Sequence, residues 1–323
     1  MNILNRFQNL VSDEILAVEI LMRQQAEGFN IDLQAALDHL ISSGGKRIRP
    51  NITLLVGKML NGDMERLIIL SAAIELLHTA TLVHDDLIDG SLLRRGIPTL
   101  NSKWTPAATV LTGDFMFAKA AKLAADTNSV PVMKLFANTL GIIVNGEIVQ
   151  MFSSHCQSDM DLYYKRIYSK TASLFETSTT SAAIICEANR TQKEYLRQFG
   201  YELGIAFQII DDVLDFTSNQ DKLGKPVGGD LRLGLITLPA ILYFEQYKDD
   251  NLTNEFFQHD CNPPIEILEK LILNIRNSSA IKNSFDKANS HIEFCLKALH
   301  HLPIGLERDA LEELACFVTQ RNI

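Results

Sequence analysis

Hydrophobic positions recur along much of this chain at the spacing of a helix face. One stretch repeats apolar residues every three or four positions: Ile68, Ile69, Ala72, Ala73, Leu76, Leu77 and Ala80. A later stretch repeats them in much the same way: Leu135, Leu140, Ile143, Val144 and Ile148. Residues three and four apart share one side of an α-helix, whereas a half-buried strand alternates with a period of two. Because such alternation is scarce here, the pattern predicts an all-α chain.

Helix-breaking residues divide the chain without separating it into two compositional halves. The chain has nine prolines, and none lies between Val132 and Lys225. Polar and glycine-containing breaks fall at residues 42–45, 90–98, 153–159 and 217–229. Long stretches without proline suit uninterrupted helices, and no Ser- or Gly-rich linker marks a domain boundary. We therefore expect residues 1–323 to form a single domain of roughly a dozen helices.

Composition narrows the class of protein. The 30 Lys and Arg residues stand against 39 Asp and Glu residues, a formal charge of −9, which argues against a nucleic-acid partner. The five cysteines are scattered, without a C-x-x-C pair, and are interpreted as reduced thiols of a cytoplasmic protein: Cys156, Cys186, Cys261, Cys295 and Cys316. Polar residues interrupt the N-terminus before an apolar run of signal-peptide length develops. We expect no membrane-spanning segment, since no uninterrupted apolar run is long enough.

Two acidic clusters have the same D-D-x-x-D form. The first aspartate cluster is Asp85, Asp86 and Asp89, and the second is Asp211, Asp212 and Asp215. On a helix, the three carboxylates of each cluster would project as one patch. Apolar residues precede both clusters, and like charges in such surroundings need cations to be tolerated. No Lys or Arg lies in the same helical turns, and oxygen ligands of this kind favour Mg²⁺.

The two aspartate clusters have two other interpretations, a solvated helix face and a carboxylate-bridged metal site. A single D-D-x-x-D could be a solvated helix face, but two copies in apolar sequence make that reading weak. A di-iron or di-manganese carboxylate bundle uses Glu and Glu-x-x-His, whereas these clusters contain only Asp.

Basic residues that suit phosphate groups lie next to predicted loops. The basic loop, Gly44–Pro50, contains Lys46, Arg47 and Arg49, and Arg94-Arg95 follows the first aspartate cluster. Arg binds phosphate oxygens in a bidentate way and Lys adds a compact charge. Neither Gly45-Lys46 nor Gly224-Lys225 satisfies the P-loop pattern, so a nucleotide triphosphatase is disfavoured. Single residues of this kind are more often surface charges.

Further polar residues have helical spacing to the aspartate clusters. His78 lies two turns before Asp85, so it could reach a second anionic ligand. Gln208 lies one turn before Asp211 and Asp212, and Lys170-Thr171 offers a cation and a hydroxyl.

These motifs, taken in order from about Leu40 to Leu242, resemble those of the trans-isoprenyl diphosphate synthases. The matching segments are residues 44–50, 82–89, 94–99, 113–114, 146–150, 170–174, 207–216 and 223–225. The resemblance implies an all-α fold with a central cavity lined by both aspartate clusters, usually in a homodimer. It implies an enzyme that joins isopentenyl diphosphate to an allylic diphosphate of geranyl or farnesyl type, and it implies Mg²⁺, three ions per active site.

The resemblance also implies roles for individual residues. Catalysis would use Asp85, Asp86, Asp89, Arg94, Lys170, Asp211, Asp212 and Lys225. Metal ligands would be Asp85, Asp86, Asp89, Asp211 and Asp215. The allylic diphosphate would contact Arg94, Lys170, Thr171, Gln208 and Lys225, and isopentenyl diphosphate would contact Lys46, Arg49, His78 and Arg95. Short-chain members carry a Lys five residues after the position of Asp230, where this chain has Leu235.

Product length is expected to depend on the helical turn before Asp85. Ala80 and Thr81 are small, whereas bulky aromatic residues there stop the chain early in the family. We therefore expect a product longer than farnesyl, for a quinone side chain. Candidates for a deeper tunnel floor are Leu76, Leu77, Phe136, Leu140 and Ile143, although a single residue of this kind is more often ordinary core.

Three alternatives stay open at this point. A terpene cyclase usually pairs one D-D-x-x-D with a dissimilar motif, a regulatory subunit of a heteromeric synthase tends to lose the aspartates, and geranylgeranyl diphosphate is a shorter possible product. Release of a long product can involve peripheral contact with a membrane. The Thr217–Gly229 stretch is a candidate lid, or else an ordinary surface loop.

Overall fold

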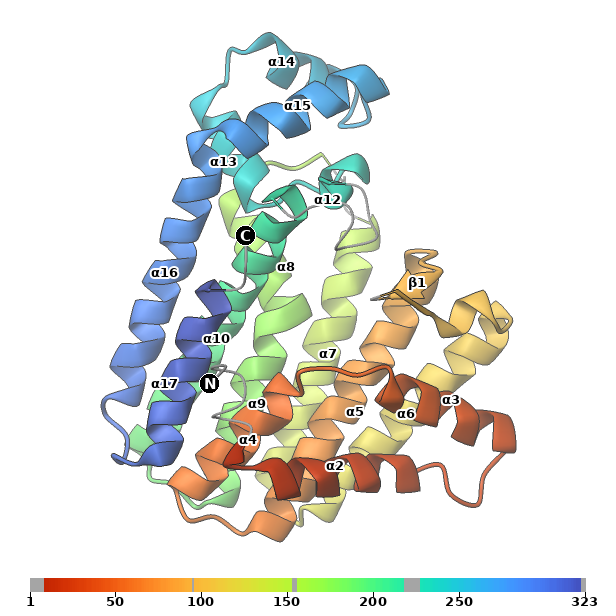
Figure 1. Cartoon of the computed structure of the whole chain (residues 1–323), viewed down its shortest axis with the longest axis vertical. Helices are drawn as coiled ribbons and strands as arrows, with labels where there is room; N and C mark the ends of the chain where they lie inside the picture. The colour runs from red at the N-terminus through yellow and green to blue at the C-terminus, as the bar shows by residue number, and fades with distance from the viewer. Residues whose placement is uncertain (1–8, 95, 153–155, 218–226, 321–323) are drawn as a thin grey trace. The chain divides into compact units, whose positions relative to one another are not determined.

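The computed structural model describes residues 9–94, 96–152, 156–217 and 227–320, and it confirms the all-α prediction. The helices are α2 (Ser12–Gln24), α3 (Ile31–Ser42), α4 (Ile48–Met59), α5 (Met64–Ile88), α6 (Pro106–Asp126), α7 (Val130–Phe152), α8 (Met160–Ile167), α9 (Ser173–Ile185), α10 (Arg190–Thr217), α12 (Gly229–Arg232), α13 (Leu238–Gln246), α14 (Asn251–Gln258), α15 (Ile265–Asn277), α16 (Ser279–Leu299) and α17 (Leu306–Thr319) (Figure 1). Short 3-10 and π-helical turns lie at Leu100–Ser102 and Tyr168–Ala172.

The chain divides into two compact units, each assembled from separate segments. Unit 1 takes its described residues from Met1–Leu140, Leu174–Gly200 and Ala298–Leu314, and unit 2 from Gly141–Ser173, Tyr201–Lys297 and Ala315–Ile323. The two units are described separately below. The expected single domain over residues 1–323 stays a prediction.

Unit 1 is organised around α5. This helix packs against α2, α4 and α6 (Figure 1). Asp63 caps its N-terminus, because its carboxylate accepts hydrogen bonds from the backbone of Glu65 (3.0 Å) and Arg66 (3.3 Å). The apolar positions that predicted the helix are mostly buried, including Ala72, Ala73, Leu76 and Leu77, so the core of unit 1 surrounds α5.

A two-stranded hairpin follows α5 in unit 1. Strands β1 (Leu93–Arg94) and β2 (Ile97–Pro98) pair antiparallel, with Leu93 opposite Pro98 and Arg94 opposite Ile97. The polar break that the sequence shows at residues 90–98 therefore contains a hairpin as well as turns. Arg94 is therefore the last residue of β1, a few residues after the end of α5.

Among the described residues, two helices are long and apolar enough to cross a membrane by length and composition alone. In the most apolar 18-residue stretch of α5, 67% is buried, as expected of a core helix, whereas in α7 the buried share of that stretch is 22%. Because a core helix passes the same test as a membrane span, the expected lack of a membrane-spanning segment stays a prediction.

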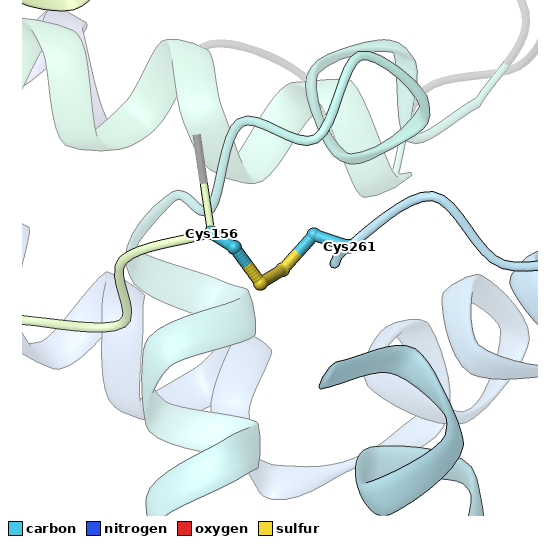
Figure 2. The surroundings of a disulfide bond; sticks show 2 residues. All are labelled: Cys156 and Cys261. Atoms are coloured by element: carbon cyan, nitrogen blue, oxygen red, sulfur yellow. A yellow bond between two sulfur atoms is a disulfide. The ribbon is translucent and has the colours of Figure 1, made fainter. Parts of the chain in front are cut away.

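Unit 2 contains a disulfide bond, which contradicts the prediction that all five cysteines are reduced thiols. Cys156 and Cys261 are joined, with their Cα atoms 5.4 Å apart (Figure 2). Cys156 precedes α8, and Cys261 follows α14 in a left-handed backbone conformation (φ 61°). The sequence separation of 105 residues hides the pair, because only the fold brings the two segments together. Among the described residues, Cys186, Cys295 and Cys316 take no part in a disulfide bond.

Candidate active site

The first aspartate cluster lies at the C-terminal end of α5, in unit 1. Asp85 and Asp86 are in the last helical turn, and Asp89 is the residue that ends the helix. Asp86 is buried, Asp85 is half-buried and Asp89 is exposed. The helix therefore presents the three carboxylates within one turn, as the spacing predicted.

Arg94 balances the charge of the most buried aspartate in this cluster. Its Nε donates to both oxygens of Asp86, at 2.9 and 3.0 Å, and its Nη2 lies 2.8 Å from Asp86 Oδ1. Asn101 Nδ2 donates to the backbone carbonyl of Asp86 at 3.2 Å. The cation therefore comes from the hairpin that follows α5, and not from the helix itself. Arg95, the second member of the arginine pair, lies outside the described residues.

A close approach of α6 fixes the helical turn that carries the first aspartate cluster. His84 Nε2 lies 3.2 Å from the carbonyl oxygen of Val110 and 3.7 Å from Asp114 Oδ1. A Cβ atom at Gly113 would collide with the His84 ring. Glycine is required there because a larger residue would push α6 away from α5.

The basic loop separates its three cations. Lys46 is exposed, whereas Arg47 and Arg49 are both 8% exposed. The Arg49 guanidinium lies over the Phe175 ring, 4.4 Å from its centroid, so an apolar wall limits its position. His78 is half-buried on α5, against which α4 packs. Unit 1 thus contains the three described residues predicted to hold isopentenyl diphosphate.

The predicted chain-length residues lie on α5 as expected. Ala80 is fully buried, and the half-buried Thr81 donates its hydroxyl to the carbonyl of His78 at 2.7 Å. Most candidates for the tunnel floor are buried too: Leu76, Leu77, Phe136 and Ile143. Leu140 is half-buried. Burial fits both a tunnel wall and ordinary core, so their role in product length stays a prediction.

The second aspartate cluster lies on α10 in unit 2, and its carboxylates have different surroundings. Asp212 is 3% exposed and accepts hydrogen bonds from Tyr163 Oη (2.7 Å) and Gln208 Nε2 (2.8 Å). Asp215 accepts from the backbone N–H groups of Gly229 (3.1 Å) and Asp230 (3.3 Å) at the start of α12. Asp211 is half-buried. The cluster therefore has one deeply buried member that the protein itself hydrogen-bonds.

Burial changes the protonation of the Asp212–Tyr163 pair. Burial, and then the charge of Asp230, raises the pKa of Asp212 to about 7, although hydrogen bonds from Gln208 and Tyr163 lower it. Burial and the neighbouring Asp212 raise the pKa of Tyr163 well above its ordinary value. Tyr163 therefore stays protonated and donates. The sequence analysis missed Tyr163, whose only signal is a tyrosine on the apolar side of α8.

A π-helical turn presents the Lys170-Thr171 pair. The Tyr168–Ala172 segment forms this turn between α8 and α9. Thr171 donates its hydroxyl to Gln208 Oε1 at 2.6 Å, and Lys170 Nζ lies 3.1 Å from Glu147 Oε1 on α7. A Cβ atom at Gly146 would crowd Ser169, so glycine lets α7 approach the turn. Thr171, Gln208, Asp212 and Tyr163 form one hydrogen-bonded chain. Glu147, which the sequence analysis included in the 146–150 motif without a role, is the partner of Lys170.

Residues 218–226 of the candidate lid, which include Lys225, lie outside the described residues. Leu235, at the position where short-chain members carry Lys, is half-buried. Its backbone N–H donates to the carbonyl of Asp230 at 2.9 Å.

The donor chemistry of both clusters suits Mg²⁺. Within the described ranges, no group of three or more His, Cys, Asp and Glu side chains is assembled closely enough to hold a metal ion. Each cluster nevertheless offers carboxylate oxygens within one helical turn, and carboxylates together with water and phosphate oxygens are the usual ligands of Mg²⁺. Arg94 binds Asp86 while Tyr163 and Gln208 bind Asp212, so at each cluster a metal ion would compete with the protein's own donors for the middle carboxylate.

An all-α fold that carries one aspartate triplet at the end of α5 and another on α10 is the arrangement that the resemblance to prenyltransferases acting on diphosphates implies. The family model described as "Polyprenyl synthetase" matches residues 31–271, and the chain belongs to that family. Its enzymatic class is that of a trans-polyprenyl diphosphate synthase.

Relatives and solved structures agree with this assignment. A Synechocystis protein named "Prenyl transferase" is 37% identical over 90% of this chain and 90% of its own length. The Bacillus subtilis "Heptaprenyl diphosphate synthase component 2" is 34% identical over 97% of this chain and 90% of its own. The crystal structure of heptaprenyl diphosphate synthase from Staphylococcus aureus has a TM-score of 0.91 at 34% identity, covering 97% of this chain and 99% of that one.

Proposed function

We propose that this chain condenses isopentenyl diphosphate with an allylic diphosphate of geranyl or farnesyl type, head to tail and in the trans configuration. The product is a polyprenyl diphosphate longer than farnesyl, for a quinone side chain. The observation that carries the proposal is that both aspartate triplets are intact, with Arg94 bound to Asp86 in the first and with Tyr163 and Gln208 bound to Asp212 in the second. Relatives named heptaprenyl diphosphate synthase support the product class.

Metal binding is assigned to the aspartates. Asp85 and Asp89 on α5, and Asp211 on α10, are proposed as ligands of Mg²⁺, with Asp86 and Asp215 completing the set and three ions per active site. When bound, Mg²⁺ neutralises the charge that develops on the departing diphosphate.

The chain's own cations bind and orient the two substrates. Arg94, Lys170, Thr171, Gln208 and Lys225 are assigned to the allylic diphosphate, and Lys46, Arg49, His78 and Arg95 to that of isopentenyl diphosphate. Cleavage of the allylic C–O bond leaves negative charge on the diphosphate, which the basic side chains stabilise more strongly in the transition state than before it. Apolar walls exclude water from the allylic cation. The isopentenyl double bond attacks that cation, and the proton lost from the adduct passes to the released diphosphate.

The proposal is tested by paired substitutions in the two aspartate clusters. Asp85→Asn and Asp211→Asn preserve size but remove a ligand charge, and each is expected to reduce turnover of radiolabelled isopentenyl diphosphate by about 100-fold or more. Asp309→Asn, in the first turn of α17, is the matched control and should be fully active. Full activity of both cluster variants would overturn the assignment.

A homodimer is proposed from the exposed apolar side of α7. Val144, Ile148 and Phe152 follow one another at helical spacing, and Phe152 is 84% exposed. A solvent-exposed apolar strip of this length marks a protein–protein contact, and we assign it to a second copy of the chain. We also propose that the protein acts in the cytoplasm, with at most peripheral contact with a membrane during product release.

A second candidate is that the chain needs a different partner. Two relatives, from Bacillus subtilis and Geobacillus stearothermophilus, are named "component 2" of a heptaprenyl diphosphate synthase. The purified chain incubated alone with Mg²⁺, isopentenyl diphosphate and farnesyl diphosphate separates the two candidates. Extension of farnesyl diphosphate supports a self-sufficient enzyme, whereas product formation only after a second component is added supports the heteromer.

A further inference from the structure

Arg47 has no role in the proposed chemistry, although it lies between the two basic-loop residues assigned to isopentenyl diphosphate. It immediately precedes α4 and has a left-handed backbone, with φ 46° and ψ 39°. This conformation is unfavourable for a residue other than glycine, so other interactions must hold it in place. The side chain is buried, unlike that of the adjacent Lys46.

The Arg47 guanidinium joins three helices of unit 1. Its Nε donates to Glu19 Oε1 on α2 at 2.9 Å, and its Nη1 donates to Glu75 Oε1 on α5 at 3.1 Å. Its Nη2 donates to the carbonyl of Ile41 on α3 at 2.7 Å. These fixed directions use the planar fork of an arginine, which a lysine ammonium cannot reproduce.

The backbone of the loop is held from the other side by Asn51. The carbonyl of Arg47 accepts from Asn51 Nδ2 at 2.8 Å and from the Asn51 backbone N–H at 2.9 Å. The carbonyl of Lys46 lies 3.4 Å from the same Nδ2. Side chain and main chain together therefore fix the backbone at Lys46 and at the start of α4, which carries Arg49.

The Arg47–Glu75 pair also sets the position of the loop along α5. Glu75 is 5% exposed and lies one turn before His78, the third residue assigned to isopentenyl diphosphate. Burial lowers the pKa of Arg47, but the charges of Glu75 and Glu19 outweigh it and raise that pKa overall, so the guanidinium stays charged. The pair thus connects the loop to the helix that carries His78.

We propose that Arg47 is a positioning residue: by binding Glu19, Glu75 and the Ile41 carbonyl, it holds Lys46 and Arg49 in register with His78 for the diphosphate of isopentenyl diphosphate. This inference rests on the proposed function. A purely structural ion pair would stabilise unit 1 without favouring one substrate over the other, so the comparison of the two substrates separates the two roles.

The test measures steady-state kinetics for both substrates in Arg47→Lys and Glu75→Gln. Each variant should raise KM for isopentenyl diphosphate by about 10-fold or more, while KM for farnesyl diphosphate stays within about twofold. The double variant should show no further increase, because both changes break the same link. Arg66→Lys is the matched control, since Arg66 makes one hydrogen bond to the Thr127 carbonyl (2.9 Å) in the same unit, and its two KM values should be unchanged.

Equal changes in both KM values, or a lower melting temperature with unchanged KM values, would overturn the inference. If Arg47→Lys fails to fold, Glu75→Gln decides, because it keeps the size of the buried side chain. Calorimetric titration with isopentenyl diphosphate alone separates this inference from the proposed function. If the wild type binds isopentenyl diphosphate and both variants lose this binding, the positioning role is supported even if no product forms. If the wild type is active and both variants bind isopentenyl diphosphate equally well, the positioning role alone is refuted.

Discussion

At the scale of single residues, the two aspartate clusters are not sets of equivalent ligands. Arg94 binds Asp86, and Tyr163 and Gln208 bind Asp212, so other side chains hold the middle aspartate of each cluster. Asp215 instead accepts hydrogen bonds from the backbone N–H groups of Gly229 and Asp230. The middle aspartate of each D-D-x-x-D is therefore expected to orient its neighbours.

Removing the Tyr163 hydroxyl is expected to weaken unit 2. Tyr163→Phe leaves the buried Asp212 carboxylate with one hydrogen bond fewer, which costs about 1 to 3 kcal/mol of unfolding free energy. Urea denaturation measures the loss. Tyr164→Phe is the control, since that hydroxyl makes only a 3.5 Å contact with His291 Nε2. Equal stability of the two variants would contradict the assigned role of Tyr163.

A bulky residue at position 80 is expected to shorten the product. Ala80 is fully buried on α5 one turn before Asp85, so Ala80→Phe would place a ring where the growing chain is proposed to pass. Reversed-phase chromatography of the dephosphorylated products measures chain length. Thr319→Phe, at the end of α17, is the control. An unchanged product length in Ala80→Phe would refute the tunnel assignment.

Cys186 is expected to react slowly with alkylating reagents. Burial raises the pKa of this thiol to about 11, with a small opposing effect of Arg66, so at pH 8 only about one molecule in a thousand carries the thiolate. The folded thiol should therefore alkylate roughly tenfold faster with each pH unit, without levelling off near pH 9. Site-resolved mass spectrometry measures the rates, with the urea-unfolded chain as reference. A plateau near pH 9 in the folded protein would contradict the raised pKa.

At the scale of elements, the sequence predicts the helices better than the turns between them. The three- and four-residue spacing predicted α5 because most buried positions of this core helix are apolar. The π-helical turn at Tyr168–Ala172 leaves no such pattern, although its Ser169 lies where a Cβ atom at Gly146 on α7 would collide with it. The partners of Asp212 show both cases: helical spacing predicted Gln208 beside it, whereas Tyr163 lies 49 residues away, where no sequence pattern connects the two.

The Cys156–Cys261 disulfide is expected to stabilise unit 2. It closes a loop across a sequence separation of 105 residues, and a crosslink of that kind contributes about 2 to 5 kcal/mol, mainly by restricting the unfolded chain. Cys261→Ser should lower the urea midpoint under non-reducing conditions, whereas Cys316→Ser, which removes a free thiol, should not. Alkylation of both Cys156 and Cys261 in the folded, non-reduced protein would show that the bond is not formed.

At the scale of the whole molecule, the proposed dimer accounts for an apolar helix that the single chain leaves largely exposed. Ile148→Glu puts a charge in the middle of the exposed side of α7 and should convert a dimer into a monomer in size-exclusion chromatography with light scattering. Ile304→Glu is the control, because Ile304 is equally apolar and 85% exposed but lies far along the chain from α7. A wild-type chain that is monomeric at all concentrations would contradict the dimer.

The account as a whole requires one chain to carry out repeated trans condensation through two aspartate clusters. The most direct test is product chromatography after the purified chain is incubated with Mg²⁺, radiolabelled isopentenyl diphosphate and farnesyl diphosphate. The account predicts an all-trans polyprenyl diphosphate longer than farnesyl, formed by the wild type and lost in Asp85→Asn and Asp211→Asn. A wild-type chain that releases a cyclic hydrocarbon, or that leaves farnesyl diphosphate unextended with and without an added second component, would contradict it.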